Sequence, residues 1–112
     1  MEVIRKYPED MSTREAYKLM NSNETKKMSD AEGSVLNPKA WIMYEDVTAK
    51  TGEIKKVVSL ITEDGEIFGT ISESFINAFE RIVDFFDGEV GEIKVVSGVS
   101  KAGRTYITCD IV

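Results

Sequence analysis

The sequence predicts a mainly β fold (β + α) with one central helix, preceded by an N-terminal helical segment. From residue 40 onward the chain is rich in aromatic and β-branched residues and is punctuated by turn signals. Between residues 72 and 88, apolar residues recur at three- and four-residue spacing, which indicates a helix. Two further strand-like runs follow this helix and are separated by a short glycine-containing loop.

Residues 1–39 are expected to form a helical and loop extension that packs on a main domain of residues 40–112. Ser12 followed by Glu15 is a capping-box pattern, in which the first side chain accepts a hydrogen bond from the backbone of the second residue. This pattern predicts a helix over residues 12–21. Its short apolar face consists of Ala16, Leu19 and Met20.

The first strand of the main domain is expected over Trp41 to Val47, and it ends at the turn-like Lys50-Thr51-Gly52. Strands two and three are expected over residues 54–62 and 66–71. They flank Asp64-Gly65, a dipeptide that favours a two-residue type I′ turn in which both residues take positive φ.

Ser72 or Ser74 caps the helix that is expected next, and Gly88 ends it. Strands over residues 92–99 and 104–111 follow, joined by a three-residue loop, Lys101-Ala102-Gly103. Three strands, a helix and two strands are the order of a five-stranded OB-type barrel with its helix between strands three and four. We expect the helix aromatics in the core: Phe75, Phe79 and Phe86.

The Asp64-Gly65 turn assigns side chains to faces, because a two-residue turn pairs residues whose numbers sum to 129. This register places Phe68 and Lys55 on the outer face of strands two and three, where OB folds commonly bind oligonucleotides. We place Tyr44 on the same face, since one of Trp41 and Tyr44 is expected to be exposed. The alternative for Phe68 is that it packs beneath the N-terminal segment. The inner face is apolar and comprises Val58, Leu60, Ile67, Gly69 and Ile71.

The three-residue loop of the last hairpin pairs residues whose numbers sum to 204. Lys94, Arg104 and Tyr106 then point outward beside Lys101, and Lys94 lies opposite Asp110. Bases stack on aromatic rings for roughly 1 to 3 kcal/mol each while cations follow the phosphates. The alternative for Tyr106 is that its hydroxyl anchors the loop. The candidate nucleic-acid-binding residues are Tyr44, Lys50, Lys55, Phe68, Lys94, Lys101, Arg104 and Tyr106.

Charge is distributed unevenly along a chain whose formal net charge is −6. Residues 63–92 carry nine acidic side chains and a single basic one, Arg81. In the last nineteen residues, three cations face only Asp110, which leaves a mildly basic strip available for phosphates.

The composition excludes most enzyme classes. Histidine is absent, which removes the commonest general base and metal ligand. Cys109 lies in an apolar, alternating run, and we interpret it as a small buried hydrophobe. We therefore expect no catalytic residue, no metal and no cofactor. No apolar run approaches the roughly 18 residues that span a membrane, and a single cysteine forms no internal disulfide, so we expect a cytoplasmic protein without a membrane partner.

The segment SGVSKAGRTYITC (Ser97 to Cys109), with the upstream DAEGSVL and YEDV and the SESF start of the helix, resembles small phage single-stranded DNA-binding proteins. Such proteins occur in phages of Gram-positive hosts and in related mobile elements. The resemblance extends over nearly the whole chain. It implies a partner, single-stranded DNA, and a role in coating exposed strands during DNA replication or recombination in the host cytoplasm. Further expected partners are replication or recombination proteins and, through free strand edges, second copies of the chain.

Two other functions fit parts of the sequence. Asp46 with Glu53-Ile54-Lys55 superficially resembles a metal-dependent nuclease site, but the triplet follows a turn instead of lying on a later strand. The second is an acidic protein-binding module or DNA-mimicking inhibitor, whose surface from Glu63 to Glu92 occupies a basic partner.

Overall fold

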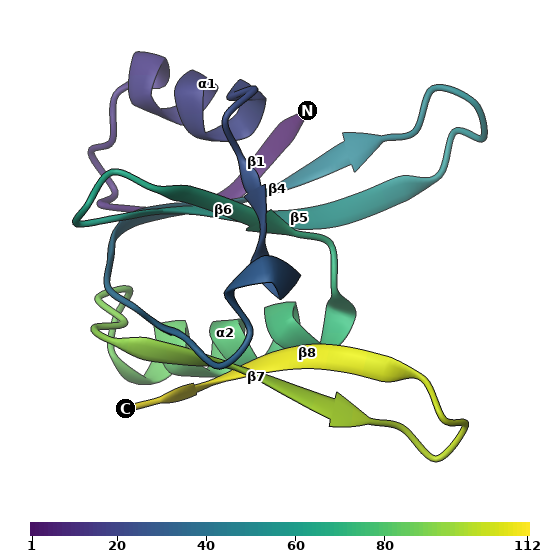
Figure 1. The fold of residues 1–112 in the computed structure, drawn as a ribbon. Helices are drawn as coiled ribbons and strands as arrows, with labels where there is room; N and C mark the ends of the chain where they lie inside the picture. The colour runs from purple at the N-terminus through teal and green to yellow at the C-terminus, as the bar shows by residue number, and fades with distance from the viewer.

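The computed structural model describes residues 1–112 and contains two β-sheets, two α-helices and a short 3-10 helix (Figure 1). The five-stranded sheet has the order β1 (Glu2–Tyr7), β4 (Pro38–Val47), β5 (Ile54–Thr62), β6 (Ile67–Thr70) and β2 (Lys26–Lys27). The three-stranded sheet has the order β3 (Val35–Leu36), β7 (Ile93–Val99) and β8 (Thr105–Ile111). The helices are α1 (Thr13–Asn21), η1 (Met28–Ala31) and α2 (Glu73–Phe85).

The mainly β class and the predicted order of three strands, a helix and two strands are confirmed by β4, β5, β6, α2, β7 and β8. A closed five-stranded barrel is not formed, because the strand ladders divide into two sheets. Only Asn37 separates β3 from β4, yet β3 pairs with β7 and β4 pairs with β5. One bent segment, residues 35–47, therefore belongs to both sheets and connects them on one side.

Helix α2 lies between the two sheets and supplies much of the core (Figure 1). The Ser72 hydroxyl caps it by accepting a hydrogen bond from the Phe75 amide. Phe75 and Phe79 are buried, as predicted. Phe86 is not in the core, because it follows the last helical residue and is 42% exposed.

Helix α1 covers the outer face of the five-stranded sheet. Its predicted cap is confirmed, since Ser12 Oγ accepts a hydrogen bond from the Glu15 amide at 3.1 Å. Ala16 and Leu19 pack in a second apolar cluster with Ile42 and Tyr44 of β4. Both faces of β4 are therefore covered, one by α2 and the other by α1.

Three N-terminal strands, β1, β2 and β3, were not predicted. β1 pairs antiparallel with β4, and its register shifts between Val3 and Arg5. β2 pairs in parallel with β6 through Lys26 and Lys27 alone. The N-terminal residues thus extend the five-stranded sheet at both of its edges.

The register of the last hairpin is as predicted: Lys94 lies opposite Asp110, and Gly98 lies opposite Tyr106. The β5–β6 register differs from the prediction by one residue, since Leu60 pairs with Phe68. The reason is the turn. Gly65 has a φ of +86° but Asp64 does not take positive φ, so the type I′ geometry does not form and the loop contains three residues, 63–65.

A one-residue shift exchanges the two faces of a strand. Phe68 therefore points to the core side with Leu60, whereas Ile67 and Gly69 point to the side covered by α1. The predicted outward position of Phe68 and the predicted inward position of Ile67 are wrong. No helix of the chain has the length and apolar character required to cross a membrane.

Candidate nucleic-acid interface

Two β-hairpins extend to the same side of the molecule, one from each sheet (Figure 1). The β4–β5 hairpin closes with a hydrogen bond from the Thr48 amide to the Glu53 carbonyl at 2.9 Å. The β7–β8 hairpin closes with a bond from the Ser100 amide to the Arg104 carbonyl at 2.8 Å. We call these two hairpins the arms, with loops at residues 48–53 and 100–104.

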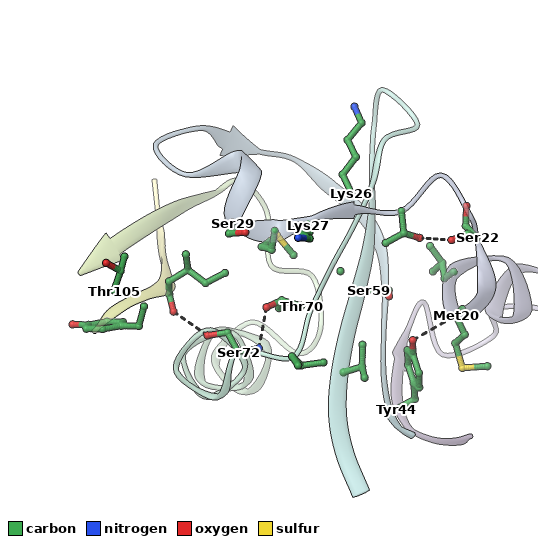
Figure 2. A pocket seen from close by; sticks show the side chains of 18 residues that line it. Met20, Ser22, Lys26, Lys27, Ser29, Tyr44, Ser59, Thr70, Ser72 and Thr105 are labelled. Carbon is green, nitrogen blue, oxygen red and sulfur yellow. Dashed lines mark hydrogen bonds between the residues drawn. The ribbon is translucent and has the colours of Figure 1, made fainter. Parts of the chain in front are cut away.

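A groove of about 720 Å³ lies between β6 of the five-stranded sheet and β8 of the three-stranded sheet, two strands that do not pair with each other. One wall is formed by the end of α1 and the following segment up to Ser29, and the opposite wall by Thr105, Tyr106 and Ile107 of β8. Figure 2 shows the hydroxyls of Ser29, Thr70 and Thr105 around it. The lining combines apolar surface with hydroxyl and ammonium groups and is open to solvent. We call this site the groove.

Tyr106 is the exposed aromatic ring of this groove, with 41% of its surface accessible. Its ring lies directly over Gly98, its cross-strand partner, because glycine has no side chain to occupy that space. An aromatic ring that is both exposed and supported from below presents a flat surface for stacking. Its hydroxyl forms no hydrogen bond to the loop, so the anchoring alternative for Tyr106 receives no support.

Exposed cations occur in the loops of the two arms. Lys101 and Arg104 are exposed in the loop of the same hairpin, and Lys50 is exposed in the loop of the other arm. Lys55 is half-buried and lies opposite Asp46 in the β4–β5 ladder. The predicted cations Lys50, Lys101 and Arg104 therefore belong to the two loops that extend to one side.

Lys26 and Lys27 also line the groove, and sequence reasoning missed both. Lys26 pairs with Glu66 at 3.0 Å, and Figure 2 shows its side chain extending away from the groove. Lys27 forms no ion pair. Their position depends on the parallel pairing of β2 with β6, which no local pattern indicates.

Lys94 is exposed, as predicted, but lies at the other end of the β7–β8 hairpin from the loop. It faces Asp110 across the ladder without forming an ion pair. The structure therefore separates Lys94 from the cations of the arms.

Phe68 is only 6% exposed and belongs to the main core cluster, beneath the Lys26 ammonium group, which lies 5.8 Å from the centre of its ring. The alternative position, beneath the N-terminal segment, is the one the structure shows. In this conformation Phe68 offers no ring face to a ligand.

Tyr44 points to the outer side of the five-stranded sheet, but α1 covers it and leaves it 6% exposed. Its hydroxyl donates a hydrogen bond to the Met20 carbonyl at 3.4 Å (Figure 2). Burial raises the pKa of the Tyr44 phenol; a hydrogen bond with Ser59 opposes this increase, and the charge of Asp46 adds a smaller one. Trp41 is buried as well, so the expectation that one of the two aromatics is exposed is wrong.

No group of three or more histidine, cysteine or acidic residues could hold a metal ion. Cys109 is buried and free, and burial followed by the charge of Asp110 raises the pKa of its thiol to about 12. A thiol in this environment is not a nucleophile at neutral pH.

Comparison with known proteins gives one match, which extends over nearly the whole chain. Residues 9–112 match the family described as phage single-stranded DNA-binding protein. No curated protein and no solved structure matches the chain.

Proposed function

The chain belongs to the phage single-stranded DNA-binding protein family, and from this premise we propose that the groove between the arms holds a DNA single strand without regard to its sequence. The family is one of binding proteins and not of enzymes. The family does not identify the surface that binds the DNA strand.

The exposed Tyr106 ring over Gly98 carries this proposal. Bases from any sequence can stack on it, because every base has a π-face. Lys27 lines the groove with Tyr106, and Lys101 and Arg104 are exposed in the loop of the same hairpin as Tyr106. None of the three forms an ion pair, so their charges are available to the phosphates. This combination of one stacking platform and several exposed cations favours single strands, whose bases are accessible, over duplexes.

The arrangement of strands supports an OB-type reading of the two sheets. The bent segment of β3 and β4 joins both sheets, as the first strand of a partly open barrel does. In that reading β5 and β6 are strands two and three, and the arm loops are those between strands one and two and between strands four and five. These are the elements with which OB folds bind oligonucleotides. We further propose that residues 1–39 are an extension on an OB-type domain of residues 40–112.

In the cell, such a protein would protect or organise single strands exposed during phage DNA replication or recombination in the host cytoplasm. The acidic surface around α2 supports this role, because it repels DNA from the rest of the molecule and restricts contact to the groove.

Titration of a fluorescent thymidine oligonucleotide at low salt, followed by anisotropy, tests the proposal. We expect wild-type binding and a loss of roughly 1 to 3 kcal/mol in Tyr106→Ala, the value of one stacked base. The matched control is Tyr17→Ala, because Tyr17 is an aromatic residue on α1 with 66% exposure that lies outside the groove. Equal affinity of Tyr106→Ala and wild type would show that the groove is not the binding site.

A further inference from the structure

The groove is a positively charged hollow in an acidic chain. None of its 18 lining residues is acidic, although the chain carries 20 acidic residues and a formal net charge of −6. The charged residues of the lining are Lys26 and Lys27. Both belong to the segment between α1 and η1, residues 22–27, which we call the strap. The strap therefore supplies all of the charge that lines the groove.

The two lysines of the strap differ in their surroundings. The Lys26 ammonium group pairs with Glu66 at 3.0 Å, and its side chain extends away from the groove (Figure 2). Lys27 is exposed and forms no ion pair. Glu24, the one carboxylate of the strap, does not line the groove. Lys27 is thus the lining cation that is available to a phosphate.

The strap is fixed at its ends and weakly held between them. Leu19, near the end of α1, is buried in the second apolar cluster, and Met28, directly after the strap, is fully buried in the main core. Between these anchors, two residue pairs and the exposed Lys26–Glu66 ion pair attach the strap to β6. An exposed ion pair adds little to such an attachment. The position of the strap therefore depends on how closely it can approach β6.

Gly69 allows this close approach. It lies opposite Lys27 in the β2–β6 ladder, and it has no positive φ, so its backbone does not require glycine. A Cβ atom at position 69 would lie 3.2 Å from Thr25 Cγ2 and 3.4 Å from Ser59 Oγ. Carbon atoms in contact normally lie roughly 3.5 to 4.0 Å apart. A glycine inside a strand is typical of a place where another segment comes close.

The Thr25 side chain is held in place by the strap itself. Thr25 Oγ1 donates a hydrogen bond to the Ser22 carbonyl at 2.9 Å, and rotation of the side chain would break this bond. On the other side, Ser59 is 2% exposed and has no room to move aside. A side chain at position 69 would therefore displace the strap and not the sheet.

We propose that the strap is the phosphate-binding wall of the groove and that Gly69 positions it, by leaving room for the Thr25 methyl group beside β6. This inference rests on the proposed function of the groove. Gly69 acts as a positioning residue, since its effect on DNA binding passes through Lys27. A β-branched residue would suit the strand β6 better than glycine does, so the glycine serves the strap and not the strand.

The salt dependence of binding by Gly69→Val tests this inference. We expect the slope of log K against log salt to fall by about 0.7, the value of one phosphate contact on a single strand, as in Lys27→Ala. The double variant Gly69→Val/Lys27→Ala should show the slope of Lys27→Ala, because both changes remove the same contact. Lys39→Ala is the matched control, since Lys39 is exposed and lies outside the groove, and it should keep the wild-type slope.

A compensating pair of changes tests the contact itself, and it remains usable if Gly69→Val does not fold. Gly69→Ala should lower the slope in the same direction by a smaller amount. Thr25→Ser removes Cγ2 but keeps the hydroxyl that bonds to Ser22, so Gly69→Ala/Thr25→Ser should recover the wild-type slope. If Gly69→Ala and Gly69→Val lower the free energy of unfolding but leave the slope unchanged, the role of Gly69 is only structural and the inference is wrong.

Acetylation of the lysines, with and without a thymidine oligonucleotide and followed by mass spectrometry, locates the contact. The oligonucleotide should protect Lys27 in the wild type but not in Gly69→Val, and Lys39 should be modified equally in every sample. Wild-type protein that binds the oligonucleotide, loses affinity in Tyr106→Ala and leaves Lys27 unprotected overturns this inference while the proposed function stands. Wild-type protein that binds no oligonucleotide overturns the proposed function and this inference with it.

Discussion

Gly98 and Tyr106 are coupled by close approach: a Cβ atom on Gly98 would lie 2.6 Å from both Cζ and Oη of Tyr106. Carbon atoms do not approach ring atoms to this distance, so any side chain at position 98 must displace the ring. Because Tyr106 is 41% exposed, the ring can move outward without disturbing the core. Position 98 therefore controls where the ring lies while contributing little packing of its own.

Gly98→Ala is expected to weaken binding to single-stranded DNA by up to the roughly 1 to 3 kcal/mol of one stacked base, with little change in the free energy of unfolding. Anisotropy titration measures the first quantity and urea unfolding the second. If Gly98 acts through Tyr106, the double variant Gly98→Ala/Tyr106→Ala should bind as Tyr106→Ala does. Additive losses in the double variant would mean that Gly98 acts independently of the ring.

Arg104→Ala is expected to reduce the salt dependence of binding. Each phosphate contact removed lowers the slope of log K against log salt by about 0.7 for a single strand. Titrations at several salt concentrations measure this slope. Lys94→Ala is the matched control, since Lys94 is exposed on the same hairpin at the end away from the loop. An equal effect of the two variants would show that the DNA contacts the whole β7–β8 hairpin and not only its loop.

Local patterns were sufficient for both α-helices and for the strands β4 to β8, but not for the N-terminal strands β1, β2 and β3. The Ser12 and Ser72 caps, the α2 periodicity and the Lys101-Ala102-Gly103 loop each depend on neighbouring residues, and the structure has them as predicted. The register predicted from Asp64-Gly65 is wrong because it assumed a positive φ at Asp64, which Asp64 does not have. The conformation of this one turn residue determines which face every side chain of β6 occupies. As a result, Phe68 lies in the core and not on the surface where it was predicted.

The site required contacts between distant segments, which local patterns do not encode. Tyr44 is correctly expected on the outer side of its sheet, but the helix that covers it comes from residues 13–21. Lys27 reaches the groove only through the two-residue pairing of β2 with β6. Tyr106 and Arg104 were accessible to sequence reasoning because both lie on one hairpin, whose loop length alone sets the register.

Phe68→Ala is expected to lower the free energy of unfolding by about 3 to 5 kcal/mol, the usual cost of removing a buried phenylalanine ring. The ring is 6% exposed and packs in the main core cluster. Urea unfolding followed by tryptophan fluorescence measures the change. Phe85→Ala is the matched control, since Phe85 is 82% exposed and its truncation should change stability by less than about 0.5 kcal/mol.

The affinity of Phe68→Ala for DNA, measured under conditions where it stays folded, separates the two positions considered for this residue. Affinity close to that of the wild type is expected from its burial. A loss of affinity as large as that of Tyr106→Ala, in a variant of unchanged stability, would indicate that Phe68 contacts the DNA.

Cys109 is expected to make stability depend on alkaline pH. Its folded-state pKa is raised from 9.0 to about 12, chiefly by burial, so the folded protein holds the thiol proton more tightly than the unfolded chain does. The resulting stabilisation is fully present below pH 9 and is lost as the pH rises from 9 toward 12, because only the unfolded chain then gains by ionising. The raised pKa of Tyr44 acts in the same direction above pH 10.

Urea unfolding across this pH range should therefore show a steeper loss of stability for the wild type than for Cys109→Ala, which retains only the contribution of Tyr44 and other groups. A thiol reagent at neutral pH gives an independent measurement. Because Cys109 is 6% exposed and protonated, it should react no faster than the protein unfolds, and urea should accelerate the reaction. Rapid modification of the folded protein would show that the strand β8 opens locally at Cys109, and it would remove the burial on which the pH prediction depends.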